Sequence, residues 1–457
     1  MTDSVDLLEQ KLASYAERGV TRVKLALTDL DGVLRGKYVS LDKFASLLAK
    51  GGGFCDCVFG WDVEDQLYDA GVYTGWHTGF PDADYRVLVD SERWLADENT
   101  PLFLGQFVGA LGAPHPICPY TRLQQMLDRL ASHGFSLKSG FEYEFFVFDE
   151  TPHSVRDKGY RELRPLTPGN FGYSVLRASA HGAEFAGLMD YCRELHCDLE
   201  GLHCETGPGV WEGALRPELG MEAADRAALF KTFAKVFFSR MDCMATFMAK
   251  WSMDYPGQSG HFHFSLLDES GTNAFGNADN DGNSPLMAQA VAGLERFLPD
   301  LLPMVAPTIN SYTRLVKGAW APTAATWGVE NRTAAIRVIP GDTARQHIEC
   351  RVPGADGNPY LVAAAVIAAA LGGIEQGLTP GEAVVGDAYA VEDKLPSSLR
   401  FSSNLRDAAD RMERSELARD MFGEEFVDHF VMSRRWECAE YERHVNAWQL
   451  ERYFEII

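Results

Sequence analysis

The sequence predicts an α+β protein with a small N-terminal unit, residues 1–110, and a larger unit, residues 111–457. Two observations predict this division. Residues 109–116 have the Gly-, Ala- and Pro-rich composition of a linker. Beyond them, helical and strand patterns alternate, and several strands place polar and apolar residues in turn. That pattern is typical of a mainly antiparallel sheet backed by helices.

The N-terminal unit opens with a helical pattern, because Leu8, Leu12 and Tyr15 fall on one stripe. An alternating strand, a tight turn at Asp29–Gly32 and a second strand then predict a hairpin. The expected elements are a helix at 4–17, strands at 21–28 and 33–39, and a helix at 41–50.

The larger unit shows no internal repeat and no low-complexity tract. Its periodicity predicts helices near 121–133, 176–195, 221–249, 285–300 and 358–376. Strands are expected near 136–148, 196–205, 259–267, 333–339 and 346–352. The last stretch, 404–457, is mostly helical in pattern and charged.

Charge and apolar content exclude some classes of partner. Lys and Arg number 42 against 65 Asp and Glu, a net charge of −23, which argues against nucleic acid as the main partner. No basic stretch followed by an apolar one opens the chain, and the apolar run at 360–374 is too short to cross a bilayer. We therefore expect a cytoplasmic protein that binds no membrane.

The nine cysteines form no C-x-x-C pair, which predicts reduced thiols in the cytoplasm. Cys55 and Cys57 are separated by one residue. A metal site there is one interpretation, but we expect the two side chains to pack as small apolar groups.

Ionisable residues recur at strand spacing in four separate segments. Because a strand sends alternate side chains to one face, Glu142 and Glu144 point the same way, with backbone sites about 7 Å apart. His261, His263 and Ser265 share a face in the same manner. One such segment alone would favour a solvent-facing strand, but four in one chain favour a shared site.

The other two segments complete a set of candidate metal ligands. Glu205 and Glu212 flank a Gly-Pro-Gly turn, and Glu349 alternates with apolar neighbours. Carboxylates with one imidazole suit Mg²⁺ or Mn²⁺ better than zinc. The predicted ligands are Glu142, Glu144, Glu205, Glu212, His261 and Glu349.

Arginines cluster in the same part of the sequence, and guanidinium groups suit carboxylates and phosphates. The candidates are Arg314, Arg332, Arg337 and Arg351. Cations held by carboxylates, together with convergent arginines, are what phosphoryl transfer requires. Neither a G-x-x-x-x-G-K-[ST] loop nor a G-x-G-x-x-G after a strand is present, so nucleotide binding would use another architecture.

These segments, in this order, resemble motifs of the glutamine synthetase superfamily, and the resemblance covers essentially the whole chain. The motif segments are 142–146, 205–212, 260–265, 310–314, 331–337 and 348–351. The resemblance implies a β-grasp domain over 1–110 and a glutamine synthetase-type catalytic domain over 111–457. It implies a ligase that activates the γ-carboxylate of L-glutamate with ATP as an acyl phosphate, which an amine then attacks.

The resemblance also implies roles for individual residues. Glu144, Glu205 and Glu212 would hold one cation and Glu142, His261 and Glu349 another, in a site with two or three Mg²⁺ or Mn²⁺ ions. ATP would contact Glu200, His263 and Ser265. Glutamate would contact Arg314, Arg351 and the loop that ends at Gly260, and phosphoryl transfer would be stabilised by Arg332 and Arg337.

The same resemblance implies a homo-oligomer, a dodecamer of two stacked hexameric rings with each active site between neighbouring subunits. An Asp from the next subunit's N-terminal domain would take the amine's proton, and Asp56 is the candidate.

Two departures from the family pattern concern substrate contacts. The glutamate loop is altered to Gly257–Gly260, and the flap reads Lys317–Pro322, with Trp320 where the family has a glutamate that binds ammonium. Loss of the carboxylate partner of a desolvated cation costs about 3–5 kcal/mol, whereas a cation–π contact returns about 0.5–2 kcal/mol. Each buried CH₂ of an alkylamine adds about 0.8 kcal/mol, so we expect a small monoamine substrate, with Trp320 against it.

Alternatives remain open at this level. Trp320 would equally well pack under a closed loop. A polyamine would need a second anionic anchor, which the acidic residues after Asp56 offer: Asp62, Glu64, Asp65 and Asp69. An ammonia-using glutamine synthetase and a non-catalytic oligomeric homologue are the remaining readings, although none of the six predicted metal ligands is missing.

Overall fold

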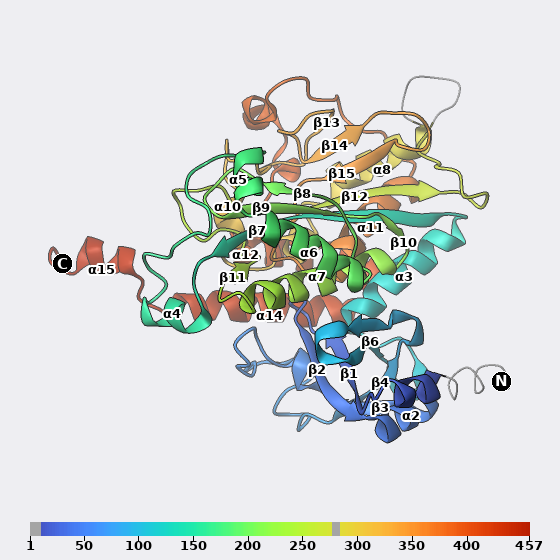
Figure 1. Ribbon diagram of the computed structural model, residues 1–457. Coiled ribbons are helices and arrows are strands. Elements are labelled where there is room, and N and C mark those ends of the chain that lie inside the picture. Colours follow the sequence, from blue (N-terminus) through green and yellow to red (C-terminus); the bar gives the residue numbers. More distant parts are fainter. Residues whose placement is uncertain (1–10, 277–283) are drawn as a thin grey trace.

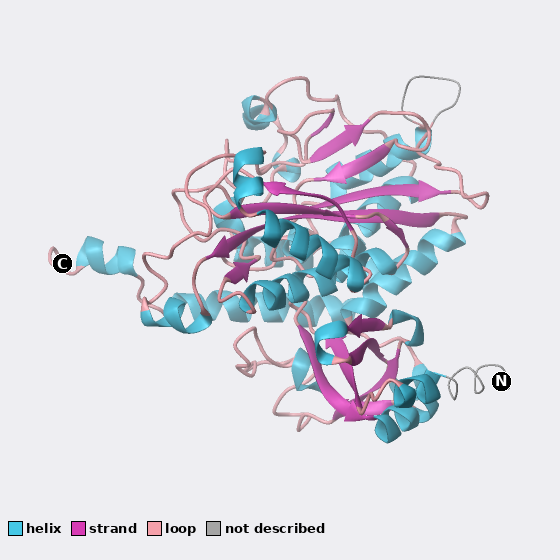
Figure 2. Cartoon of the chain, viewed as in Figure 1, coloured by secondary structure: helices cyan, strands magenta, loops and turns pink. Residues whose placement is uncertain are grey.

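The computed structural model describes residues 11–276 and 284–457 and contains two sheets (Figures 1 and 2). The smaller sheet lies in the lower part of Figure 1, and the larger one, with most of the helices, lies above it. The residue 110/111 boundary and the β-grasp assignment stay predictions.

The smaller sheet has six strands in the order β2-β1-β6-β4-β3, with β5 paired to β6. Their bounds are β1 Arg22–Thr28, β2 Leu34–Ser40, β3 Gly52–Cys55, β4 Asp82–Val87, β5 Arg93–Leu95 and β6 Thr100–Phe107. The predicted hairpin is confirmed as β1 and β2, and the predicted helix as α2, Leu41–Lys50, whose first turn is capped by the Ser40 side chain. Of the helix expected at 4–17, residues 11–17 are helical and the rest lie outside the described residues.

The larger sheet has nine strands in the order β13-β14-β15-β12-β7-β9-β8, with β10 and β11 also paired to β7. The bounds are β7 Ser136–Phe148, β8 Leu199–Cys204, β9 Val210–Leu215, β10 Glu218–Leu219, β11 Met244–Thr246, β12 Gly260–Leu267, β13 Trp327–Val329, β14 Ile336–Ile339 and β15 His347–Cys350. Every pairing is antiparallel except β13 with β14. The expectation of a mainly antiparallel sheet is therefore confirmed, and the sheet curls into a half-barrel (Figure 2).

Helices cover one side of this sheet (Figures 1 and 2). The longer ones are α3 Pro119–Ser132, α6 Gly182–Glu194, α7 Glu222–Ser239, α8 Pro285–Phe297, α11 Pro359–Glu375 and α14 Glu424–Glu442. The shorter ones are α4 Pro152–Asp157, α5 Val175–Ala180, α9 Leu302–Val305, α10 Ser311–Arg314, α12 Leu405–Glu413, α13 Glu416–Phe422 and α15 Ala447–Tyr453. The Ala-rich α11 is buried along nearly its whole length. Among the described residues, none of the helices combines the length and apolar composition that crossing a membrane would need.

Two predicted helices were wrong in extent. The helix expected over 221–249 ends at Ser239, because the chain turns at Asp242, which has a positive φ of 54°, and residues 244–246 then pair with β7 as β11. The helix expected over 176–195 is divided at His181 into α5 and α6. In both cases apolar residues continue past the break, so periodicity alone did not show it.

Candidate active site

Register brings the four charged segments to one face of the larger sheet. Directly paired residues on neighbouring strands project to the same side, and Glu142 pairs with His261. Glu349 of β15 pairs with His263 on one side and with Arg337 on the other. On the opposite face, the alternate residues of these strands are core, as Phe141, Phe262 and Ile348 show.

The first acidic group consists of Glu142, His261 and Glu349. The His261 Nδ1 atom lies 3.3 Å from an oxygen of Glu142 and 3.3 Å from an oxygen of Glu349. One ligand atom from each residue lies within 4.8 Å of the others, a separation that a single cation could bridge. These three residues are one of the two ligand sets expected from the sequence.

The second acidic group consists of His203, Glu205 and Glu212. The His203 Nε2 atom is 3.1 Å from Glu205 Oε2 and 3.5 Å from Glu212 Oε1. The predicted ligand Glu144 pairs with Glu212 across β7 and β9, and its Oε2 accepts a hydrogen bond of 2.6 Å from the Ser259 N–H.

His203 is a residue that the sequence analysis missed. It lies two residues before Glu205, so the same alternation rule that singled out the other segments could have found it. The ring of Tyr173 stacks on it with centroids 4.4 Å apart.

The carboxylates of the site differ in proton affinity. Burial, reinforced by repulsion from Glu142, Glu144 and Glu205, raises the pKa of Glu212 to about 10. Burial also acts to raise the pKa of Glu349, but the cationic groups around it prevail and hold that pKa well below its usual range. The second group therefore contains more negative charge than its neighbours balance.

This uncompensated negative charge indicates whether a divalent cation fits the second group. Carboxylate oxygens crowded around one imidazole, with one carboxyl group forced toward its protonated form, are stabilised by a small hard cation. The donor set, oxygen with a minority of nitrogen, suits Mg²⁺ or Mn²⁺. The residues present thus fit two divalent cations, one in each group.

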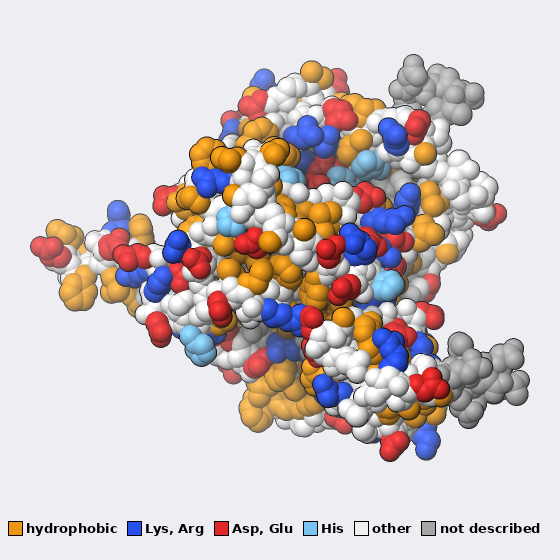
Figure 3. Space-filling view, in the orientation of Figure 1, with side chains coloured by type: hydrophobic (Ala, Val, Ile, Leu, Met, Phe, Trp, Pro, Cys, Tyr) orange, Lys and Arg blue, Asp and Glu red, His pale blue; other side chains and the backbone are white. Residues whose placement is uncertain are grey.

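A cavity of about 260 Å³ adjoins the first group. Its lining includes all three residues expected to contact ATP, which are Glu200, His263 and Ser265, together with Glu142. Burial lowers the pKa of His263 to about 4, so its ring is neutral at neutral pH, and its Nδ1 lies 3.2 Å from His347 Nε2. Figure 3 shows a hollow on this side of the molecule, with histidines and carboxylates at its floor and Lys or Arg at its rim.

The four arginines occupy different positions around the site. Arg337 and Arg351 both donate to Glu349, at 2.9 Å and 2.6 Å. Arg314 is buried and donates to the carbonyl oxygens of Val352 and Arg351, so only its remaining N–H groups are available to a substrate. Arg332 is exposed.

Three further predicted residues are placed as follows. Gly260 opens β12 where a Cβ atom would lie 2.8 Å from the Tyr143 ring and from the Gly354 carbonyl oxygen, so no larger residue fits without a shift. Trp320 lies on a turn after α10 with 65% of its surface exposed. Asp56 directly follows β3 of the smaller sheet, and Figure 1 shows that β3 lies apart from the strands that hold the acidic groups.

Comparisons with known proteins agree with this geometry. Residues 116–453 match the family described as "Glutamine synthetase, catalytic domain". The chain is 44% identical over 445 residues to type-1 glutamine synthetase 2 of Dictyostelium discoideum, covering 95% of this chain and 84% of that protein. It is 33% identical over 454 residues to glutamate–isopropylamine ligase of a Pseudomonas species, covering 98% of each.

A solved structure of a GmaS/ADP complex has the same fold, with a TM-score of 0.83 at 27% identity over 97% of this chain and 99% of that one. The family match spans most of the larger unit, and the relatives extend over both sheets. The chain therefore belongs to the glutamine synthetase family, as an ATP-dependent carboxylate–amine ligase of its γ-glutamyl-amine synthetase-like branch.

Proposed function

We propose that this enzyme joins the γ-carboxylate of L-glutamate to a small primary monoamine, alkyl or arylalkyl, through a γ-glutamyl phosphate made with ATP. The observation that carries the choice of amine is the flap, Lys317–Pro322, which has Trp320 and no carboxylate. Similarity to glutamate–isopropylamine ligase supports the same choice.

The two acidic groups would hold the cations that the reaction needs. Glu142, His261 and Glu349 would hold one Mg²⁺ or Mn²⁺, and Glu144, Glu205 and Glu212 another. When bound, such cations neutralise the charge of phosphate oxygens. Arg337 and Arg351 keep Glu349 ionised and fix its orientation, which prepares that carboxylate to bind a cation.

The nucleotide would enter the cavity beside the first group, which supports roles for Glu200, His263 and Ser265. The exposed Arg332 and the half-buried Arg337 would stabilise the transferred phosphoryl group. Glutamate would bind between Arg351, the free N–H groups of Arg314 and the loop that ends at Gly260, beside the second group.

The amine would lie against the flap. Without a flap carboxylate, ammonium lacks the partner that would offset its desolvation. Three buried CH₂ groups contribute about 2.4 kcal/mol, a factor of roughly 50 in binding. An exposed tryptophan ring is a surface that an alkyl chain can cover when the flap closes.

Asp56 of a neighbouring subunit would take the proton that the amine loses. Within one chain this residue follows β3 of the smaller sheet, so we infer that it reaches the acidic groups from a partner subunit. This arrangement requires an oligomer, and the dodecamer of two hexameric rings is part of the proposal.

The test is a phosphate-release assay with ATP, Mg²⁺, L-glutamate and a panel of isopropylamine, ethylamine, benzylamine, ethanolamine, putrescine and ammonium. We expect a small monoamine to give a kcat/KM at least about tenfold above that of ammonium. Mass spectrometry of the product would show the γ-glutamyl amide. Ammonium as the best substrate would contradict the proposal.

Ammonia-dependent glutamine synthesis is the second candidate, and the 44% identity to a glutamine synthetase favours it. The Trp320→Glu variant separates the two. If an amine is the substrate, the restored carboxylate should raise kcat/KM for ammonium by about tenfold or more, in line with a carboxylate partner for a desolvated cation. An unchanged preference for ammonium in both proteins would establish the second candidate. Preference for putrescine would show polyamine use, and no phosphate release with any amine would show a non-catalytic homologue.

A further inference from the structure

Two thiols flank Asp56 where β3 ends. Cys55 is the last residue of β3, and Asp56 and Cys57 open a short 3₁₀ turn, Asp56–Phe59. Both cysteines are half-buried, whereas the other seven are buried. The expectation that this pair would pack as buried apolar groups was therefore wrong, because both side chains are only half-buried.

The turn brings the two side chains together. A helical residue holds the Cα atoms of its two neighbours about 5.4 Å apart, inside the range of about 4.4–6.8 Å found in disulfides. The two thiols are close enough for Cys55 to act on the pKa of Cys57, and the Cys55 thiol donates to the Phe80 carbonyl oxygen at 3.6 Å. A disulfide to Cys57 would replace this contact with the Phe80 carbonyl oxygen.

The surroundings of the pair affect the reactivity of the Cys57 thiol. Burial, with the nearby Cys55 and Asp56, raises the pKa of Cys57 to about 12, although the Arg35 guanidinium acts in the other direction. Cys57 therefore keeps its proton at neutral pH, which makes its sulfur a poor first nucleophile.

We propose that Cys55 and Cys57 are a modification site at which a hydroperoxide closes an intramolecular disulfide around Asp56. The Cys55 sulfur attacks the peroxide, the O–O bond breaks, and Cys55 becomes a sulfenic acid while an alcohol (or water) leaves. The Cys57 sulfur then displaces hydroxide from Cys55, and its proton leaves with that hydroxide as water. Two thiols and one hydroperoxide thus give one disulfide, one alcohol and one water.

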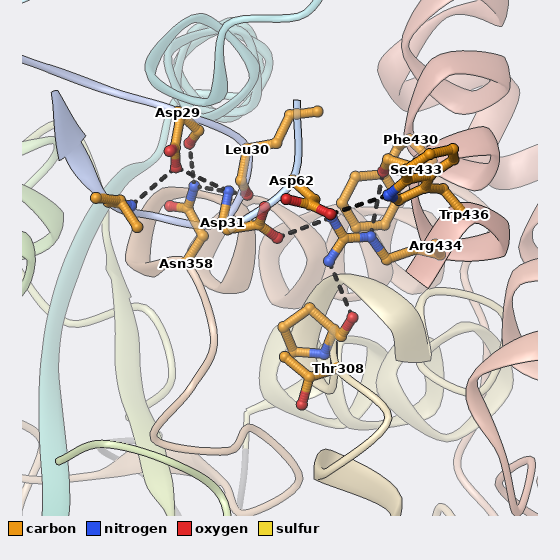
Figure 4. Close-up of polar contacts among 12 residues, drawn as sticks. Asp29, Leu30, Asp31, Asp62, Thr308, Asn358, Phe430, Ser433, Arg434 and Trp436 are labelled. Carbon is orange, nitrogen blue, oxygen red and sulfur yellow. Dashed lines mark hydrogen bonds and ion pairs between the residues drawn. The ribbon is translucent and has the colours of Figure 1, made fainter. Parts of the chain in front are cut away.

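The chain beyond the turn is fixed, so the effect of the crosslink falls on Asp56. His429 Nε2 donates to the Phe59 carbonyl oxygen at 2.7 Å, and the Trp436 N–H donates to Asp62 at 3.0 Å. Figure 4 shows Asp62 held in this way beside Arg434, which pairs with Asp31. One Asp56 carboxylate oxygen is buried with no hydrogen-bond partner in the described chain. Because Asp56 lies inside the ring that the disulfide would close, the crosslink would act directly on the backbone of this residue.

A consequence for activity rests on the proposed role of Asp56. If Asp56 serves a neighbouring active site, the disulfide should lower kcat for amine ligation by about tenfold or more, because small misplacements of a proton acceptor are costly. Dithiothreitol should restore the rate.

The covalent step can be tested without any activity assay. Trypsin cleavage after Lys50 and Arg86 releases residues 51–86, which contain Cys55 and Cys57 and no other cysteine, Lys or internal Arg. The reduced full-length protein is exposed to hydrogen peroxide, denatured with iodoacetamide, digested and analysed by mass spectrometry. We expect the mass of the 51–86 peptide to fall by two hydrogens, with no alkyl group attached. After reduction with dithiothreitol and a second treatment with iodoacetamide, the peptide should carry two alkyl groups.

Variants identify the order of events. In Cys57→Ser, Cys55 should be trapped by dimedone as a sulfenic acid, and in Cys55→Ser neither product should form. Cys438→Ser removes a buried thiol elsewhere and should still form the disulfide. Phenylarsine oxide, which bridges two thiols with loss of water, should label the wild-type peptide once and neither single variant stably.

Two results would overturn the site. One is a 51–86 peptide with both thiols alkylated after a peroxide dose that fully oxidises glutathione in the same tube. The other is a disulfide between chains, seen as a dimer on a non-reducing gel. If the disulfide forms and the rate of amine ligation does not change, the modification site is supported and the proposed role of Asp56 is contradicted.

Discussion

The two acidic groups of the site face the same way, yet they are balanced differently. In the first group, Glu349 accepts from Arg337 and Arg351 and lies 3.3 Å from His261. In the second, the His203 ring lies between Glu205 and Glu212, the Thr206 N–H donates to Glu205, and Glu144 adds a further negative charge opposite Glu212. The pKa of Glu349 is accordingly lowered, and that of Glu212 is raised to about 10.

The two groups would therefore be cation sites of unlike character on one sheet. Arginines hold Glu349 of the first group, so we expect this group to keep its shape with or without a cation. In the second group the carboxylates repel one another, and a bound cation would relieve that repulsion. Stability and cation binding should therefore respond differently to changes in each group.

The largest effect should follow from breaking the arginine-balanced group. Glu349→Gln leaves the Arg351 and Arg337 guanidinium groups without their buried counter-ion and should lower the free energy of unfolding by about 3–5 kcal/mol. Denaturant unfolding in EDTA measures this. The control is Glu330→Gln, which removes a more exposed partner of Arg337 and should cost at most about 1 kcal/mol. Equal losses in the two variants would remove the distinction between the groups.

The second effect concerns pH in the metal-free protein. Because the pKa of Glu212 is raised above its unfolded value, the folded chain binds a proton that the unfolded chain releases. That stability is complete below about pH 4 and is lost as pH rises toward 10, by at most about 2.7 kcal/mol between pH 6 and pH 8. Thermal unfolding in EDTA should show a larger loss of stability between pH 6 and pH 8 in the wild type than in Glu212→Gln, because Asp29, Asp225 and Glu295, whose pKa values are also raised, contribute equally in both proteins. An equal change of stability with pH in the two proteins would contradict the assignment.

A smaller effect should follow from His203→Gln. The imidazole orients Glu205 and Glu212, so its loss should weaken cation binding in the second group by about tenfold, or about 1.4 kcal/mol. Isothermal titration with Mn²⁺ reports this directly. Cation binding in the first group should be unaffected. Weaker binding in the first group instead would contradict the role of His203 in the second group.

Alternation predicted which residues share a face, because a strand fixes that locally. It singled out Glu142 and Glu144, His261 and His263, and Glu349, and the structure places these on the same side of one sheet. Which residues of neighbouring strands lie opposite each other could not be predicted. The pairing of Glu349 with Arg337, for example, depends on how β14 and β15 align.

The smaller sheet was harder to predict. Beyond the β1–β2 hairpin, its strands are short and separated by the long irregular segment 60–81, so no periodic pattern marks them. The end of α7 at Ser239 was missed for a related reason: apolar residues, Met241, Cys243 and Met244, continue through the turn into β11. Long-range pairing, which sequence periodicity does not contain, decides both.

Equilibrium binding of Mn²⁺ to the wild type, Glu349→Gln and Glu212→Gln shows whether the two acidic groups are separate cation sites. The wild type should bind at least two ions per chain in two classes, and each variant should lose a different class. Binding of a single class, or loss of the same class in both variants, would show that the two groups do not act as separate cation sites and would contradict the account.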